Sequence, residues 1–422
     1  MALTSFFISF RMKLKHEVER FVEPGRPEVL ERINRSAILQ ALRAQPGISR
    51  AELGRRLRLS PATVTRLVAR LKEEGLVIER PDRSPRPSGR RPMALYLNRE
   101  AYHLIGVDLG GTHLVGIIAN LEGDILEEIR RPSRPNGEAE EALPQLMEAL
   151  GELLRRARAA GYTVRGIGIG APGVTDPVAG RVVWAPAFRW RDLPLKALVE
   201  SQFGVPTFVE NDVNLAAFGE KWFGAGRDVR HLVCVFIGTG IGAGLILNGE
   251  LYRGHHYSAG EVGYVIPERA LLHQRYDVFG CLELLAAGPA IVRRVQEWLS
   301  AFPESRLHAL AAAKPLEATD VFQAATEGDP LAQQVVEETL DYLAIMLAAI
   351  IAVVDPERIL LGGGVARAGG PLVEGLRRRL DPVVPAMPEI GLSALGDRAA
   401  VLGAVAYAIF ETEGMAQIRR GL

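Results

Sequence analysis

Apolar residues recur every three or four positions through residues 34–75, and this period predicts a run of three short helices. Ile38, Leu39 and Leu42 form the apolar face of the first helix. The Gln-Pro-Gly stretch at 45–47 ends it, because proline and glycine interrupt a helical backbone. The amino-terminal part of the chain is therefore expected to be a small helical module.

Two serines mark the starts of the second and third helices. Ser49 is a good N-cap with Glu52 three residues later, which is the spacing of a capping box. Ser60 precedes Pro61, a residue favoured in the first turn, and Gly75 ends this helix. The apolar positions that bury the third helix are Val64, Leu67, Val68 and Leu71. Three helices with a tight turn at 58–60 predict a helix-turn-helix.

The third helix and the segment after it carry residues suited to contact DNA. Small, hydroxyl and basic side chains can approach base edges and phosphates. On the exposed face of the helix these are Ser60, Ala62, Thr63, Thr65, Arg66 and Arg70. Residues 76–97 predict two short strands around a basic tip, a wing, in which Gly89 permits close approach and Arg90 is expected to reach a minor groove. A helical protein-interaction module is the alternative.

Charge is distributed unevenly, although the 422-residue chain has a formal net charge of zero. Residues 1–100 hold 21 Lys and Arg against 11 Asp and Glu, a net charge of +10, and the remainder is therefore at −10. A basic module joined to an acidic one indicates a polyanionic partner for the front of the chain only. Solvated charged faces are the alternative, and the motifs favour DNA.

After residue 100 the pattern changes to apolar strands separated by glycine turns. Such turns let backbone N–H groups close on phosphate oxygens, and a threonine hydroxyl adds a donor. The candidate nucleotide-binding residues are Asp108, Gly110, Gly111, Thr112, Gly238, Thr239, Gly240 and Gly363. Asp108 is suited to hold Mg²⁺ through water. Any single turn could be a structural hairpin, but three in this order favour a phosphate site.

Asp212 stands at a predicted strand-to-helix junction within Val-Glu-Asn-Asp-Val-Asn. Its ordinary role there would be that of an N-cap. Its catalytic role would be to accept the proton of a substrate hydroxyl that attacks a γ-phosphate. The strand and Gly-Pro turn at 166–177 are expected to line the same cleft.

From about residue 31 the chain resembles the ROK family, which groups sugar-responsive repressors with sugar kinases. The matching motifs are Asp108 to Thr112, Glu210 to Asn214 and Gly238 to Gly242. The winged helix places the resemblance in the repressor branch. It implies an α/β, actin-like (ribonuclease H-like) fold of two lobes with sugar in the cleft, and assembly as homodimers or homotetramers. It also implies that Asp212 is the catalytic base if the protein is a kinase.

The resemblance assigns sugar binding to Asn211, Asp212, Glu261 and Glu283, with Tyr264 in place of the family's histidine. A tyrosine ring can stack on a sugar face. Ala187 stands where many members have an asparagine, so glucose-type specificity is not expected.

The zinc motif of the family is largely lost. Tyr264, Gln274 and Tyr276 replace three of its four ligands, and Cys281 alone remains. One thiolate cannot hold structural zinc, which needs four ligands, so no metal is expected here. His255, His256 and His273 lie nearby in sequence and are expected to be solvated or core residues rather than ligands.

The predicted organisation is a tail at 1–30, a winged helix-turn-helix at 31–98 and a sugar-kinase-like domain at 101–422. The favoured function is a sugar-gated repressor of carbohydrate-utilisation genes that binds a palindromic operator. The alternatives are an active ATP-dependent sugar kinase bearing a DNA-binding module, and a scaffold with a vestigial cleft. No cofactor is required, Mg-ATP remains open, and the absence of a signal peptide or membrane span suggests the cytoplasm.

Overall fold

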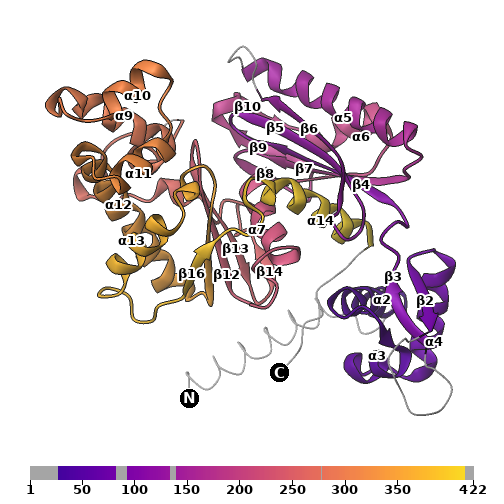
Figure 1. Ribbon diagram of the computed structural model, residues 1–422. Coiled ribbons are helices and arrows are strands. Elements are labelled where there is room, and N and C mark those ends of the chain that lie inside the picture. Colours follow the sequence, from indigo (N-terminus) through magenta and orange to yellow (C-terminus); the bar gives the residue numbers. More distant parts are fainter. Residues whose placement is uncertain (1–26, 82–92, 134–138, 277, 414–422) are drawn as a thin grey trace, which may run out of the picture. The chain divides into compact units, whose positions relative to one another are not determined.

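The computed structural model describes residues 27–81, 93–133, 139–276 and 278–413 (Figure 1). The chain forms two compact units. The first comprises residues up to Asn98 together with Glu413 and the residues after it, and the second runs from Arg99 to Thr412.

The first unit is a three-helix module with a small sheet. Its elements are α2 (Pro27–Ala44), β1 (Ile48–Ser49), α3 (Arg50–Leu57), α4 (Pro61–Glu73), β2 (Val77–Pro81) and β3 (Met93–Leu97). Both predicted caps are confirmed, because Ser49 Oγ accepts the Glu52 N–H and Ser60 Oγ accepts the Thr63 N–H, each at 3.2 Å. The two strands of the wing pair antiparallel, and β1 adds a third strand beside β3.

Apolar faces of the three helices and the sheet form the core of this unit. The predicted faces are confirmed, since Ile38, Leu39, Leu42 and the four apolar positions of α4 are all buried. Arg35 of α2 completes the unit through ion pairs with Glu74 at 2.7 Å and with Glu413 at 2.5 Å. The tip of the wing, including Gly89 and Arg90, lies outside the described residues.

The second unit contains two five-stranded sheets with the same strand order. The first, β11-β7-β4-β5-β6, consists of β4 (His103–Leu109), β5 (His113–Ala119), β6 (Ile125–Pro132), β7 (Val164–Ala171) and β11 (Thr207–Asn211). The second, β16-β15-β12-β13-β14, consists of β12 (Leu232–Ile237), β13 (Ile241–Leu247), β14 (Glu250–Tyr252), β15 (Arg358–Gly362) and β16 (Glu389–Leu392). Each sheet is an antiparallel three-stranded meander extended by two parallel strands. The predicted two-lobed architecture is therefore present.

Helices cover both sheets (Figure 1). They are α5 (Ala142–Ala159), α6 (Leu195–Phe203), α7 (Asp212–Trp222), α8 (Glu283–Ala286), α9 (Gly288–Trp298), α10 (Leu307–Ala313), α11 (Ala318–Thr326), α12 (Pro330–Val354), α13 (Gly370–Leu380) and α14 (Ala399–Glu413). A third, three-stranded sheet of β8 (Val174–Asp176), β9 (Arg181–Ala185) and β10 (Trp190–Leu193) extends the first lobe. The apolar run at 343–354 lies in α12 as expected, and no described helix combines the length and apolar content of a membrane span.

Glycines allow α14 to pack with its backbone against its neighbours. A Cβ on Gly403 would overlap with the carbonyl oxygen of Leu215 in α7. A Cβ on Gly106 of β4 or Gly168 of β7 would overlap with backbone of α14. The two strands and the helix that approach the cleft thus rest directly on α14.

Candidate functional site

A cleft of about 270 Å³ lies between the two lobes of the second unit. The first lobe contributes turns at 172–174 and 184–188, and Asn211 at the end of β11. The second contributes the start of α7, the turn at 238–240, loops around Tyr257 to Tyr264 and Val278 to Glu283, and Gly363. Residues far apart in the sequence therefore meet here as the motifs predicted.

Asp212 is the first residue of α7 and faces the cleft. Its Oδ1 accepts hydrogen bonds from the Val213 N–H at 2.9 Å and from Asn211 Nδ2 at 3.0 Å. The N-cap is Asn211, whose Oδ1 accepts the Asn214 N–H at 2.9 Å, so the ordinary capping role considered for Asp212 is wrong. Burial raises the pKa of Asp212 to about 6, which suits a group that accepts a proton near neutral pH.

Asp108 lies next to Asp212, at the end of β4. Its Oδ1 is buried and makes no hydrogen bond within the described residues. Burial, and then repulsion from Asp212, raise the pKa of Asp108 well above its usual range. Gly170 of β7 lies beside both residues, because a Cβ there would be in ordinary contact with Asp108 Oδ1 at 3.5 Å and with Asp212 Cα at 3.4 Å.

The two glycine turns that follow β4 and β12 occupy equivalent positions in the two lobes and face one another. A Cβ on Gly111 would lie 2.8 Å from Thr239 Oγ1, so a larger residue there would require the Thr239 side chain to move. Gly238, Thr239, Gly240 and Gly363 line the cleft, whereas Gly110, Gly111 and Thr112 lie beyond it. The hydroxyl of Thr112 is 3.0 Å from His113 Nδ1. Two N–H groups of these turns donate within the turns themselves, that of Gly110 to the His113 carbonyl at 3.0 Å and that of Gly238 to the Gly240 carbonyl at 2.9 Å.

Glu261 and Tyr264 also line the cleft. Of the residues that the structure describes, three acidic ones line the cleft, namely Asp212, Glu261 and Glu283. Among these three, Glu261 is the one for whose side chain the structure shows no hydrogen bond within the described residues. Burial, followed by repulsion from Asp212 and Glu283, raises its pKa to about 7. Tyr264 is 37% exposed, and burial raises its pKa to about 12, so its hydroxyl is a neutral donor and acceptor.

Glu283 lines the cleft, and each of its two carboxylate oxygens accepts one backbone N–H while keeping a further acceptor site. Oε1 accepts the Ile241 N–H at 2.8 Å and Oε2 accepts the Gly280 N–H at 2.6 Å. Asn211 is similarly engaged, since its Nδ2 donates to the Gly173 carbonyl at 3.0 Å. Both line the cleft, and both also fasten the turns that shape it.

Sequence reasoning did not single out four aromatic residues that line the cleft. Trp184, Phe188, Tyr257 and Phe279 line it, and flat apolar rings of this kind pack on the C–H faces of sugars. Ala187 also lines it, as its place in the sequence motif suggested. Tyr257 has a left-handed backbone (φ 59°), which no pattern in the sequence indicates.

The residues at the former zinc position do not fit a zinc ion. Cys281 is a buried free thiol, and Tyr276 donates its hydroxyl to the Leu271 carbonyl at 3.0 Å. Tyr264 and Gln274 offer neither thiolate nor imidazole, whereas structural zinc takes four such ligands.

The candidate DNA-reading face lies on α4 of the first unit. Ala62, Thr65, Arg66 and Arg70 are exposed, and Thr63 is half-buried with its hydroxyl 2.9 Å from Ser60 Oγ. Arg66 and Arg70 both bind the Glu31 carboxylate, an arrangement that the sequence did not suggest.

Comparison with known proteins identifies both units. Residues 104–411 match the model of the ROK family, and residues 31–78 match a winged helix-turn-helix DNA-binding model. The chain belongs to the ROK family. Its first unit is a winged helix-turn-helix of the DNA-binding type, and the predicted combination of fold classes is confirmed.

Relatives of this ROK protein include both repressors and kinases. A putative xylose repressor from Caldicellulosiruptor sp. (strain Rt8B.4) is 32% identical over 91% of this chain and 97% of its own. The crystal structure of a ROK family transcriptional regulator, a homologue of the E. coli MLC protein, has a TM-score of 0.80, 26% identity, and coverage of 92% and 98%. A ROK glucokinase from Streptomyces griseus, solved with glucose and AMPPNP, has a TM-score of 0.64, 31% identity, and coverage of 72% and 99%.

Proposed function

We propose that this protein is a sugar-responsive transcriptional repressor of carbohydrate-utilisation genes. One observation carries the proposal. The same chain contains a winged helix with exposed Arg66 and Arg70 and a cleft lined by Asp212 and Glu261. The repressor relatives support it, because they match the chain over both units whereas the glucokinase covers 72% of it.

In this proposal a sugar stands between the two lobes of the second unit. Ionised Asp212 and Glu261 accept hydrogen bonds from its hydroxyls, and the ring of Tyr264 packs on one of its faces. The sugar changes DNA binding only if the lobes hold it in one arrangement more tightly than in another. A two-fold symmetric assembly, a homodimer or homotetramer, would then present two winged helices to a palindromic operator in the cytoplasm.

The relatives' names make xylose the first sugar to test, since several of them are called xylose repressors. The cleft supports a departure from glucose-type recognition. Ala187 supplies no side-chain hydrogen bond, and Tyr264 offers a hydroxyl at the far end of a phenol ring where the family has an imidazole.

An ATP-dependent sugar kinase is the second candidate, and the placement of Asp212 beside two facing glycine turns favours it. The turns at 110–112 and 238–240 would hold nucleotide phosphates, and Asp108 would hold Mg²⁺ through water. Asp212 would take the proton of the attacking sugar hydroxyl. In either function we propose that no structural zinc is bound, because Cys281 stands without partner ligands.

One experiment separates the two functions. Purified protein is incubated with Mg-ATP and a panel of pentoses, hexoses and amino sugars, and ADP release and operator binding are both measured. Operator affinity that changes with one sugar, without ADP release, supports the repressor. ADP release that disappears in Asp212→Asn supports the kinase, and a panel that changes neither quantity contradicts both.

A further inference from the structure

The loop that leads from β14 to Glu261 is fastened at both of its ends. At its start, the carbonyl of Arg253 accepts a hydrogen bond from the Ala259 N–H at 3.1 Å. At its end, the carbonyl of Gly260 accepts one from the Ala243 N–H in β13 at 2.8 Å. The position of Glu261 in the cleft therefore depends on the positions of Arg253 and Gly260.

The side chain of Arg253 joins this loop to the other lobe. Its Nε donates to Glu210 Oε2, at the end of β11, at 2.5 Å. Glu210 is 1% exposed, and the guanidinium lies 5.8 Å from the ring centre of Tyr407 in α14. Removing the charged partner of a buried carboxylate strongly destabilises the folded protein, because the remaining charge is left buried and unpaired. The ion pair between Arg253 and Glu210 therefore holds the start of the loop against the first lobe.

The other oxygen of Glu210 holds the strand end that carries the candidate base. Oε1 accepts the Asn211 N–H at 2.9 Å and Asn214 Nδ2 at 3.1 Å. Asn211 in turn caps α7, whose first residue is Asp212. One buried carboxylate is thus bonded both to the loop that leads to Glu261 and to the junction that places Asp212.

We infer that Glu210 and Arg253 are a positioning pair that sets the placement of Asp212 relative to Glu261 and so controls sugar affinity. Neither residue lines the cleft, so neither acts by touching the ligand. The inference rests on the proposed function, because it takes a sugar as the ligand of the cleft.

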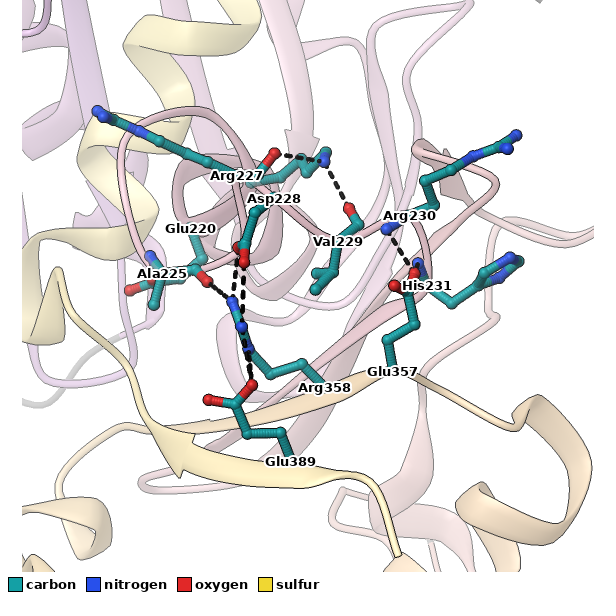
Figure 2. A network of polar contacts seen from close by, with 11 residues as sticks. Glu220, Ala225, Arg227, Asp228, Val229, Arg230, His231, Glu357, Arg358 and Glu389 are labelled. Atoms are coloured by element: carbon teal, nitrogen blue, oxygen red, sulfur yellow. Dashed lines mark hydrogen bonds and ion pairs between the residues drawn. The ribbon is translucent and has the colours of Figure 1, made fainter. Parts of the chain in front are cut away.

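A second arginine in the same unit provides a matched control. Arg358 is 15% exposed and binds Asp228 at 2.7 Å and Glu389 at 2.8 Å (Figure 2). It stands at the first residue of β15, whereas Gly363, which follows the strand, lines the cleft. Loss of its charge removes ion pairs to two exposed carboxylates and a hydrogen bond to the Ala225 carbonyl, which lies just after the end of α7 opposite to Asp212.

The experiment compares Arg253→Gln, Arg253→Lys, Arg358→Gln and the double variant Glu210→Gln/Arg253→Gln. Each is titrated by calorimetry with xylose, glucose and N-acetylglucosamine, and its thermal unfolding is recorded. For the sugar that wild type binds, Arg253→Gln is expected to weaken binding by about tenfold or more. Arg253→Lys keeps the charge and should restore affinity to within about threefold, and Arg358→Gln should stay within about twofold of wild type.

The outcomes separate this inference from the function on which it rests. Wild type that binds none of these sugars in calorimetry would overturn both. Wild type that binds, with Arg253→Gln unchanged or no weaker than Arg358→Gln, would overturn the positioning role alone. If Arg253→Gln does not fold, the double variant decides, because it leaves no unpaired buried charge and should still bind the sugar at least about tenfold more weakly.

Discussion

The Glu31 carboxylate accepts a hydrogen bond from Arg66 at 2.7 Å. Its second oxygen accepts one from Arg70 at 2.5 Å, so one acidic residue of α2 engages both arginines of the recognition helix. The hydrogen bond from Arg66 is the main cause that lowers the pKa of Glu31, which stays ionised near neutral pH. The Glu31 carboxylate thus competes with DNA phosphates for the two arginines on the face proposed to bind DNA.

Replacing Glu31 with glutamine is expected to raise operator affinity. The change releases Arg66 from Glu31, leaves Arg70 with its ion pair to Glu74 at 3.4 Å, and removes a negative charge that repels the DNA backbone. The slope of log affinity against log salt should become steeper by about one. Fluorescence anisotropy with an operator fragment selected from genomic DNA, at several salt concentrations, measures both quantities. Glu79→Gln, which releases Arg50 and Lys72, is the control, and equal effects of the two changes would contradict the assignment.

Arg66→Ala is expected to weaken operator binding by about 1–3 kcal/mol, because a base or phosphate contact is lost. Its helix should remain folded, since the Ser60 cap and the buried face of α4 are untouched. Electrophoretic mobility shift and circular dichroism measure the two properties. Arg378→Ala, on an exposed face of α13, is the control, and unchanged binding by Arg66→Ala would refute the recognition-helix assignment. Arg90→Ala tests the wing in the same assay.

Local signals in the sequence predicted the first unit well. The caps at Ser49 and Ser60 were predictable because they depend on residues within one turn of each serine. The pairing of β1 with β3 was not, because it joins Ile48 to Leu95 across the whole module and β1 has only two residues.

In the cleft, the motifs predicted which residues meet but not what each one bonds to. Asn211 rather than Asp212 caps α7, since both residues are good caps and only the backbone decides between them. Glu283 reaches Ile241, 42 positions away, and no spacing rule predicts such a contact. The approach of Gly111 to Thr239 depends likewise on the packing of two lobes.

Glu261→Gln is expected to stabilise the protein at high pH. The pKa of Glu261 is raised from 4.5 to about 7 in the folded state, so the folded protein holds this proton more tightly than the unfolded chain. The associated stability is fully present below pH 4.5 and is lost as pH rises through 7. A neutral glutamine avoids that loss. The variant's gain in the free energy of unfolding over wild type should therefore be about 2–3 kcal/mol larger at pH 8 than near pH 4.5. Urea unfolding across this range checks it, and a pH-independent gain would contradict the raised pKa.

The same titration predicts that sugar affinity rises with pH. An ionised carboxylate accepts hydrogen bonds from hydroxyls more strongly than a protonated one. With a pKa of about 7 at Glu261, affinity should rise by about tenfold or more between pH 5.5 and 8. Calorimetric titration at several pH values measures this, and Glu261→Gln should bind weakly with a flatter profile. An affinity that falls with pH would rule out the acceptor role.

Gly403→Ala is expected to destabilise the second unit by several kcal/mol, because a methyl group there would overlap with the Leu215 carbonyl. The shift of α7 needed to relieve the overlap should also weaken sugar binding. Gly370→Ala, where a Cβ would meet nothing within 4 Å, is the control. Thermal unfolding and calorimetry report the two effects, and equal stability of the two variants would disprove the close packing.

The ion pair between Arg35 and Glu413 has a consequence for how the protein is made. A ribosome synthesises Arg35 and the winged helix first, and Glu413 emerges only after the whole second unit has been translated. Glu413 is 4% exposed, so its partner Arg35 lacks a buried counterion for most of synthesis. The DNA-binding module therefore reaches its complete set of contacts last, at the end of translation, although its residues come first.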